Sequence, residues 1–231
     1  MQRFLCDAIL FDLDGVLVDS TACVERLWYQ WAIQHGLDAQ EVIARAHGRR
    51  TIDTMRAVAP TVAIEEEARG MEQAEIEDTR GLVGIAGAAD LLTTLAPSQW
   101  AVVTSGSRAL ATTRLRAVGL PLPSVFITAG DVAQGKPHPE GYLKAASLLG
   151  VTPQRCVVVE DAPAGIQAAI AASMTAIAVA STHQPAKLQA AQICVPSLAA
   201  LHTTHLKRSE PAGPSLAITV TRTIDDQLRA L

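Results

Sequence analysis

The sequence predicts a doubly wound α/β domain, in which helices cover both faces of a parallel sheet, with a small helical domain inserted into it. Short continuous apolar runs recur along the chain, and each ends at a polar or glycine-bearing turn. Segments with helical periodicity separate these runs. Continuous apolar strands are typical of parallel sheets, because helices bury both of their faces. One long segment near the N-terminus departs from this alternation, which predicts the insertion.

The predicted strands are the apolar runs, taken in chain order. They cover residues 7–11, 100–104, 124–129, 156–160, 175–180 and 191–195. Helical patterns at 108–119 and 140–150 lie between them. A last run, 215–225, alternates apolar and polar residues, which predicts a half-exposed edge strand. Ligands of such sheets bind beyond the carboxyl ends of the strands, so we expect a site in the turns that follow the runs.

Residues 19–83 form the predicted insertion. They contain no strand-like run, and helical patterns cover 23–36, 39–48 and 64–81. We therefore predict a core domain made of residues 1–18 and 84–231, and a helical domain made of residues 19–83. Gly15 and Gly84 flank the insertion, which favours hinge motion between the two parts.

Composition and charge narrow the classes of protein. Of the 231 residues, 49% are hydrophobic and 18% are charged, which allows a sizeable core. The formal net charge of -4, without a basic stripe, argues against nucleic acid as a partner. No uncharged apolar stretch is long enough to cross a membrane, and Arg3, Asp7 and Asp12 interrupt the N-terminus before a signal peptide could form. We expect a cytoplasmic protein without a membrane partner.

Asp12 and Asp14 follow the first apolar run, just before Gly15. In an extended chain residues i and i+2 point to one side, roughly 6.6 Å apart, so both carboxylates can reach one small group. A calcium loop of the EF-hand type needs glycine at its sixth position, whereas Gly15 comes fourth, which excludes that site. Two neighbouring carboxylates repel each other. The pair therefore indicates either a solvated turn or a site for a positively charged partner.

Polar residues also follow three other predicted strands. Thr104 and Ser105 precede a helix, where hydroxyls and free N–H groups suit a phosphate oxygen, although an ordinary N-cap explains them equally well. Lys136 lies in a proline-stiffened loop that follows the strand at 124–129. Glu160 and Asp161 end a very apolar strand, where a hard cation would compensate their charge. Magnesium is favoured over zinc, because the ligands offered are oxygens.

These four strand ends resemble the four motifs of the haloacid dehalogenase superfamily. They read FDLDGVLVDS, VVTSGS, GKPHPE and VVVEDAPAG, in that family's order, and the insertion resembles its helical cap. Residues 47–55, 98–107 and 135–145 are similar to those of small phosphatases of glycerol phosphate, 2-deoxyglucose 6-phosphate and related sugar phosphates. The resemblance implies a Rossmann-like core and a magnesium-dependent phosphatase that acts on a small phosphorylated sugar or polyol.

The same resemblance implies a role for each motif residue. Asp12 would be the nucleophile that forms an aspartyl-phosphate, and Asp14 the general acid and base. Lys136 and magnesium would offset the charge of the transferring group. The implied metal ligands are Asp12, the Asp14 carbonyl, Asp161 and Glu160, and the implied phosphate-binding residues are Thr104, Ser105 and Gly106.

Within the insertion, His47, Arg49 and Arg50 are our candidates for contact with the rest of the substrate. The alternative for the arginines is a solvated helical face. The aromatic residues Trp28, Tyr29 and Trp31 are predicted to form the core of the helical domain instead of a sugar platform.

A sugar phosphomutase and a phosphoacceptor module are the alternatives to the phosphatase. A β-phosphoglucomutase carries a histidine where this chain has Val24, which places the mutase second. A receiver-type phosphoacceptor module has its acidic pair first in the chain, whereas Glu160 and Asp161 come last here.

A helical cap over the site is compatible with a monomer, which is our expectation.

Overall fold

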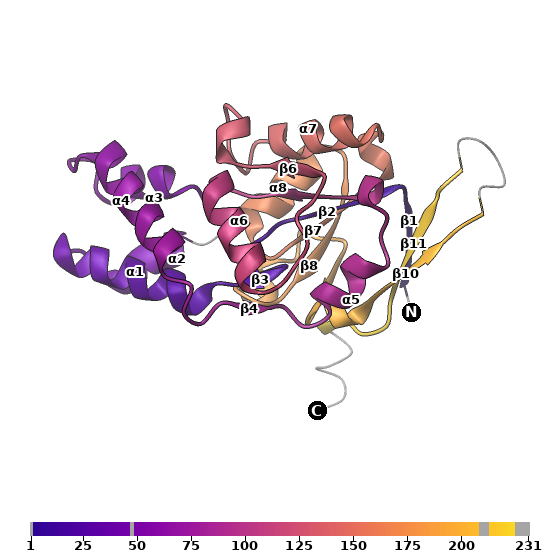
Figure 1. Cartoon of the computed structure of the whole chain (residues 1–231), viewed down its shortest axis with the longest axis horizontal. Helices are drawn as coiled ribbons and strands as arrows, with labels where there is room; N and C mark the ends of the chain where they lie inside the picture. The colour runs from indigo at the N-terminus through magenta and orange to yellow at the C-terminus, as the bar shows by residue number, and fades with distance from the viewer. Residues whose placement is uncertain (1, 47–48, 208–212, 225–231) are drawn as a thin grey trace.

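The computed structural model describes residues 2–46, 49–207 and 213–224. Its main element is a parallel sheet of six strands in the order β6-β5-β2-β7-β8-β9. Figure 1 shows part of this sheet, with β6, β2, β7 and β8 labelled. The strands are β2 (Ala8–Phe11), β5 (Trp100–Val103), β6 (Val125–Ile127), β7 (Cys156–Glu160), β8 (Thr175–Val179) and β9 (Ile193–Val195). All neighbouring pairs are parallel. The predicted fold class is confirmed.

Helices bury both faces of this sheet, which is why the strands are apolar throughout. They are α5 (Ala88–Thr93), α6 (Arg108–Ala117), α7 (Glu140–Leu149) and α8 (Pro163–Ala171). In β2, Ile9 and Phe11 pack with residues of α5 and α6. Ala8 and Leu10 point to the opposite face and pack with residues of α7 and α8. Successive side chains of one strand therefore enter two separate cores.

A second sheet contradicts one prediction. It is antiparallel, with the order β1-β11-β10, and its strands are β1 (Gln2–Cys6), β10 (Leu201–His205) and β11 (Leu216–Val220). The predicted edge strand is thus the central strand of this sheet, and Leu216, Ala217 and Ile218 are fully buried. The prediction was wrong because the partners of β11 come from both ends of the chain. Neither β1 nor β10 was among the predicted strands.

The described residues of the segment 19–83 form four helices that lie beside the main sheet (Figure 1). They are α1 (Thr21–Gln34), α2 (Ala39–Ala46), α3 (Thr51–Val58) and α4 (Ile64–Glu77). Trp28 and Trp31 are 2% and 5% exposed in the core that these helices share, as predicted, whereas Tyr29 is 51% exposed, so its predicted burial was wrong. Tyr29 lies on the outer side of α1 because the adjacent positions of a helix point in different directions.

The helical segment is joined to the main sheet at one place. The chain enters it through β3 (Val18–Asp19) and leaves it through β4 (Val83–Gly84), and these two short strands pair with each other. Entry and exit are thus side by side, as two connections of one inserted unit require. No helix in the described residues is long and apolar enough to span a membrane.

Candidate active site

Parallel strands bring the predicted residues together. Asp12 follows β2, Thr104 follows β5, and Glu160 and Asp161 lie at the end of β7, the strands being neighbours in the sheet. The backbone N–H of Asp12 continues the sheet by donating to Val159 at 3.0 Å. The carboxyl ends of these strands form one edge, and the four side chains are buried there.

Asp12 and Lys136 form the centre of this site. Lys136 Nζ lies 2.7 Å from Asp12 Oδ1, and both side chains are less than a tenth exposed. Burial raises the pKa of Asp12 to about 7, although the ammonium of Lys136 opposes this shift. The nearby carboxylates raise the pKa of Lys136 above its ordinary value, against the effect of its own burial. Lys136 is therefore a fixed positive charge beside the Asp12 carboxylate.

Glu160 holds Lys136 in place. Its Oε1 lies 2.6 Å from Lys136 Nζ and accepts a hydrogen bond of 2.6 Å from the hydroxyl of Tyr142. Its Oε2 accepts from the backbone N–H groups of Asp161 and Ala162 at 3.1 Å and 3.3 Å. Both oxygens of this fully buried carboxylate are thus engaged. Tyr142 was missed by the sequence analysis, because α7 reads as an ordinary helix and its contact with β7 is tertiary.

The Glu160 carboxylate at the end of β7 also explains why the fourth motif contains a glycine. A Cβ atom on Gly165, in the first turn of α8, would lie 1.7 Å from Glu160 Oε1. Only glycine therefore allows α8 to pack against this carboxylate.

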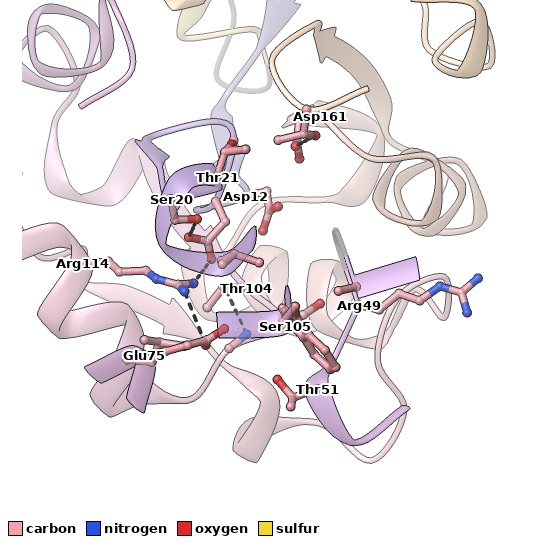
Figure 2. Close-up of a pocket in the computed structure, with 18 residues that line it drawn as sticks. Asp12, Ser20, Thr21, Arg49, Thr51, Glu75, Thr104, Ser105, Arg114 and Asp161 are labelled. Atoms are coloured by element: carbon pink, nitrogen blue, oxygen red, sulfur yellow. Dashed lines mark hydrogen bonds and ion pairs between the residues drawn. The ribbon is translucent and has the colours of Figure 1, made fainter. Parts of the chain in front are cut away.

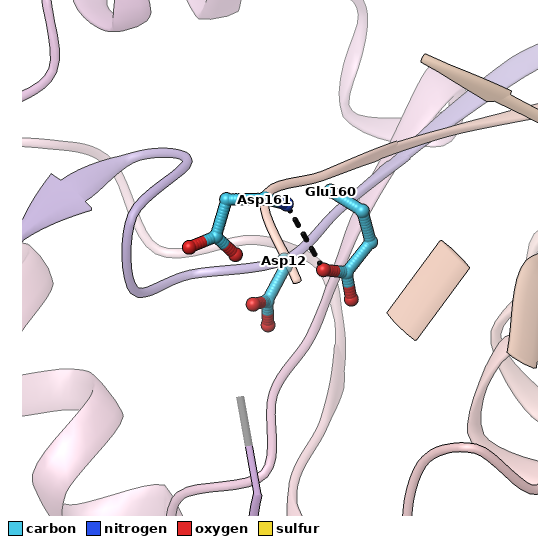
Figure 3. Close-up of side chains that lie close together, drawn as sticks. All are labelled: Asp12, Glu160 and Asp161. Atoms are coloured by element: carbon cyan, nitrogen blue, oxygen red, sulfur yellow. Dashed lines mark hydrogen bonds between the residues drawn. The ribbon is translucent and has the colours of Figure 1, made fainter. Parts of the chain in front are cut away.

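Three carboxylates could hold a metal ion. Ligand atoms of Asp12, Glu160 and Asp161 lie within 4.8 Å of one another (Figure 3). Asp161 Oδ1 is buried and has no hydrogen-bond partner among the described residues, while its Oδ2 accepts from the Thr182 hydroxyl. Burial raises the pKa of Asp161 well above its ordinary value, and the negative charges of Glu160 and Asp12 raise it further. A cation would satisfy the orphaned oxygen and compensate this excess of negative charge.

The loop after β2 is shaped around the same carboxylate. Gly15 has a φ of +78, and a Cβ atom there would lie 2.1 Å from Asp161 Oδ2. Glycine is thus required both by the backbone conformation and by the space that Asp161 fills. The donors offered are all oxygens, so the site fits magnesium.

Asp14 has different partners from Asp12, although both line one pocket. Its Oδ1 accepts from the Ser20 hydroxyl at 2.7 Å, and its Oδ2 lies 2.7 Å from Arg114 Nη1. Arg114 Nη2 in turn lies 3.4 Å from Oε2 of Glu75, a residue of α4 (Figure 2). The ion pairs thus connect the loop of the first motif with both α6 and the helical segment.

Sequence analysis missed Arg114 and Glu75. A signal was present in α6, whose buried residues are Leu110, Ala111, Arg114 and Leu115. Arg114 thus occupies a position of the apolar stripe, and an arginine there needs a buried acidic partner. The identity of that partner could not be predicted, since Asp14 and Glu75 are remote in the chain.

The loop after β5 lines the same pocket with Thr104, Ser105 and Gly106. The N-cap of α6 is Ser107, whose Oγ accepts from the N–H of Leu110 at 3.3 Å. The N-cap alternative for Thr104 and Ser105 was therefore wrong. Thr104 Oγ1 instead accepts from the N–H of Gly106 at 3.1 Å, which shapes the turn.

The arginines of the insertion approach the site from the other side. Arg49 lines the pocket, but Figure 2 shows its guanidinium pointing away from Asp12. Arg50 pairs with Asp53 at 2.6 Å. It also lies against the loop that carries Lys136, because a Cβ atom on Gly135 would be 2.9 Å from Arg50 Nε. His47 lies outside the described residues.

The chain belongs to the haloacid dehalogenase-like hydrolase family, which it matches over residues 6–173. It is 44% identical to hexitol phosphatase A of Escherichia coli over 204 residues, which are 86% of this chain and 94% of the relative. It is 40% identical to glycerol-1-phosphate phosphohydrolase 2 of Saccharomyces cerevisiae, with 76% of this chain and 75% of that protein covered. The structure of a hydrolase from Pseudomonas syringae superposes with a TM-score of 0.75 at 26% identity, covering 83% of this chain and 94% of that one. The resemblance inferred from the four motifs is thus confirmed.

Proposed function

We propose that this chain is a magnesium-dependent phosphatase that hydrolyses a small sugar or polyol phosphate monoester through an aspartyl-phosphate. The observation that carries the proposal is the Asp12 carboxylate, 2.7 Å from the Lys136 ammonium and beside a second aspartate that has separate partners. The names of the relatives, which act on hexitol and glycerol phosphates, support the substrate class.

The first half of the reaction uses both aspartates. The Asp12 carboxylate attacks phosphorus, a new O–P bond forms, and the ester P–O bond breaks. Asp14 donates a proton to the leaving alkoxide, which departs as the free alcohol. Ser20 and Arg114 fix the Asp14 side chain in one orientation for this transfer.

The second half releases phosphate. Asp14, now ionised, takes a proton from a water molecule that attacks the aspartyl-phosphate, and the carboxylate of Asp12 is restored. Lys136 compensates negative charge on the transferring group throughout. The hydroxyls of Thr104 and Ser105 bind the remaining phosphate oxygens.

Magnesium would be held by Asp12, by the orphaned oxygen of Asp161 and by the Asp14 carbonyl. When bound, it would supply positive charge against the phosphoryl oxygens. Glu160 belongs to the same cluster, but its oxygens already serve Lys136, Tyr142 and two N–H groups, so we propose that it positions Lys136.

We propose that residues 19–83 act as a cap on a core made of residues 1–18 and 84–231. Support comes from the pocket, whose lining includes Thr21, Trp28 and Glu75 of the helical segment as well as residues of the core. A cap that contributes a large part of the wall can exclude water and contact the alcohol.

The test is release of inorganic phosphate from sorbitol 6-phosphate, glycerol 1-phosphate and 2-deoxyglucose 6-phosphate with magnesium. Continuous release, far beyond one phosphate per chain, is the expected result. A phosphoacceptor module would stop after one equivalent. A mutase would interconvert β-glucose 1-phosphate and glucose 6-phosphate. Val24, which lines the pocket and cannot take up a proton, favours hydrolysis over that transfer.

A further inference from the structure

We propose that Glu75 and Arg114 recognise hydroxyl groups on the alcohol part of the substrate, and that Glu75 disfavours substrates with a second anionic group. This role presupposes the phosphatase function proposed above. It makes Glu75 a residue that determines specificity for neutral polyol and sugar monophosphates.

Glu75 is the acid of α4 that is turned toward the site. Its side chain is 5% exposed, whereas Glu77 on the same helix is exposed and accepts a hydrogen bond from Gln73. Glu75 lines the pocket that contains Asp12 and Asp14, and it also lines an adjoining cleft of about 580 Å³ between α4 and the start of α6. A buried carboxylate thus forms part of the wall where the cap helices meet the core.

The position of Glu75 relative to Asp14 places it on the alcohol side of the site. A single guanidinium lies between the two carboxylates, because Arg114 lies 2.7 Å from Asp14 and 3.4 Å from Glu75. Figure 2 shows Arg114 beside Glu75. In the proposed reaction Asp14 protonates the ester oxygen, and the loop at Thr104 binds the phosphate. The carbon atoms that follow the ester oxygen therefore extend toward Glu75 and Arg114.

Together the two side chains offer what a hydroxyl group needs. The carboxylate of Glu75 accepts hydrogen bonds. Arg114 is 4% exposed, and its Nε has no hydrogen-bond acceptor in the parts of the chain that the structure describes. Its Nη2 lies 3.4 Å from Glu75 Oε2 but does not form a hydrogen bond with it. A buried donor without an acceptor is unfavourable, so the site favours a ligand that supplies an oxygen. Hydroxyl groups of a polyol can donate to Glu75 and accept from Arg114 at once.

The charges on this side of the pocket disfavour a second phosphate or carboxylate. Arg114 is shared between two acids, so its charge is already compensated. Glu72 lines the adjoining cleft beside Glu75, and Glu65, which also lines it, pairs with Arg56 at 3.2 Å. Besides Arg114, the described cations that line the same space are Arg49, Arg50 and Arg69, of which Arg50 is paired with Asp53. A buried negative charge repels another anion strongly, because little water screens the interaction.

The variant Glu75→Gln tests this role, since it keeps the size of the side chain and removes its charge. The measurement is kcat/KM for sorbitol 6-phosphate and for fructose 1,6-bisphosphate, with magnesium at saturation and at about pH 8.5. Glu75 is ionised at this pH, because burial raises its pKa only to about 7. We expect the ratio of the first to the second to fall about tenfold or more, mainly through KM, because charge-assisted hydrogen bonds are about twice as strong as neutral ones. Glu75→Asp keeps the carboxylate and should retain part of the preference.

Glu77→Gln is the matched control, because it removes an exposed acid from the same helix. Its ratio should equal that of the wild-type protein. An unchanged ratio in Glu75→Gln, with an unaltered circular dichroism spectrum, would overturn the proposed role.

The wild-type protein provides a second test that does not depend on a variant folding. Methyl phosphate, 2-hydroxyethyl phosphate, glycerol 1-phosphate and sorbitol 6-phosphate form a series with an increasing number of hydroxyls. We expect kcat/KM to rise along the series, and equal values would contradict recognition of hydroxyls while leaving the phosphatase function intact. No release of phosphate from any of them would instead refute the phosphatase function itself.

Discussion

At the scale of single residues, the proposed chemistry depends on two aspartates with different surroundings. Asp12 is 4% exposed and lies beside Lys136, whereas the side chain of Asp14 is 30% exposed and bound by Ser20 and Arg114. One carboxylate can thus act as nucleophile while the other exchanges protons with the alcohol and with water. Asp12 and Asp14 are residues of the same type, two positions apart. We propose different roles for them because their neighbouring side chains differ.

Replacing Asp12 by Asn should abolish phosphate release and leave the fold intact. The amide cannot form an acyl phosphate, and removal of a nucleophile lowers kcat by about 10⁴-fold or more. The measurement is phosphate release together with circular dichroism and thermal unfolding. A rate equal to that of the wild-type protein would remove Asp12 from its role.

The stability of the protein should depend on pH through Glu75. Burial raises its pKa from 4.5 to about 7, although Arg114 opposes the shift. The native state therefore binds this proton more tightly than the unfolded chain, and the resulting stability is present below about pH 4.5 and lost as the pH rises through about 7. The loss through this group is up to about 3 kcal/mol.

Urea unfolding at pH 4.5 and pH 7.5, in the presence of a chelator, measures this effect. The free energy of unfolding should decrease more between these two pH values in the wild-type protein than in Glu75→Gln, whose amide does not titrate. Equal decreases would show that Glu75 titrates alike in both states.

At the scale of elements, α6 contributes to the site at two points. Its N-terminus follows the loop that carries Thr104 and Ser105, and one turn and a half later Arg114 reaches Asp14 and Glu75. The helix therefore fixes the loop of Thr104 and Ser105 and the ion-pair network relative to each other. Its own start is fixed by the side chain of Ser107.

Replacing Ser107 by Ala should lower the free energy of unfolding by about 1 kcal/mol, because one N–H group at the start of α6 loses its acceptor. Urea unfolding measures the change. Ser147→Ala in α7 is the control, since that residue is exposed inside a helix, where alanine is the better helix former. A loss as large in the control would mean that the cap of α6 contributes nothing specific.

At the scale of the whole molecule, the site exists where the sheet and the helical segment meet. The three clustered carboxylates come from the ends of β2 and β7, whereas part of the pocket wall comes from α1 and α4. The paired strands β3 and β4 are the connection between these parts, next to the loop of the first motif. Movement there would open or close the pocket without disturbing the acidic cluster.

Removing divalent cations with a chelator should stop phosphate release, and added magnesium should restore it. The far-ultraviolet circular dichroism spectrum should hardly change, because the cluster joins loops whose strands are already paired in the sheet. Undiminished turnover in chelator would contradict a role for a metal at Asp12 and Asp161.

Local patterns in the sequence were sufficient for the parallel sheet and for the four reactive strand ends. A strand buried on both faces is continuously apolar, and the turn at its end then shows as a sharp change to Asp, Thr or Glu. This change marked Asp12, Thr104 and Glu160 as candidates, and the proline-stiffened loop marked Lys136. The prediction that they share one site came from the resemblance of the four motifs to one family.

Only the tertiary structure decided which side chains contact one another. The central place of β11, the hydrogen bond from Tyr142 to Glu160, and the ion pairs of Arg114 with Asp14 and Glu75 all join segments that are far apart in the chain. An alternating apolar pattern indicates that a strand has a neighbouring strand, and a buried arginine indicates that it has an acidic partner. The identity of that partner depends on how the chain folds back on itself, because burial energy is gained from any neighbour of suitable shape and charge.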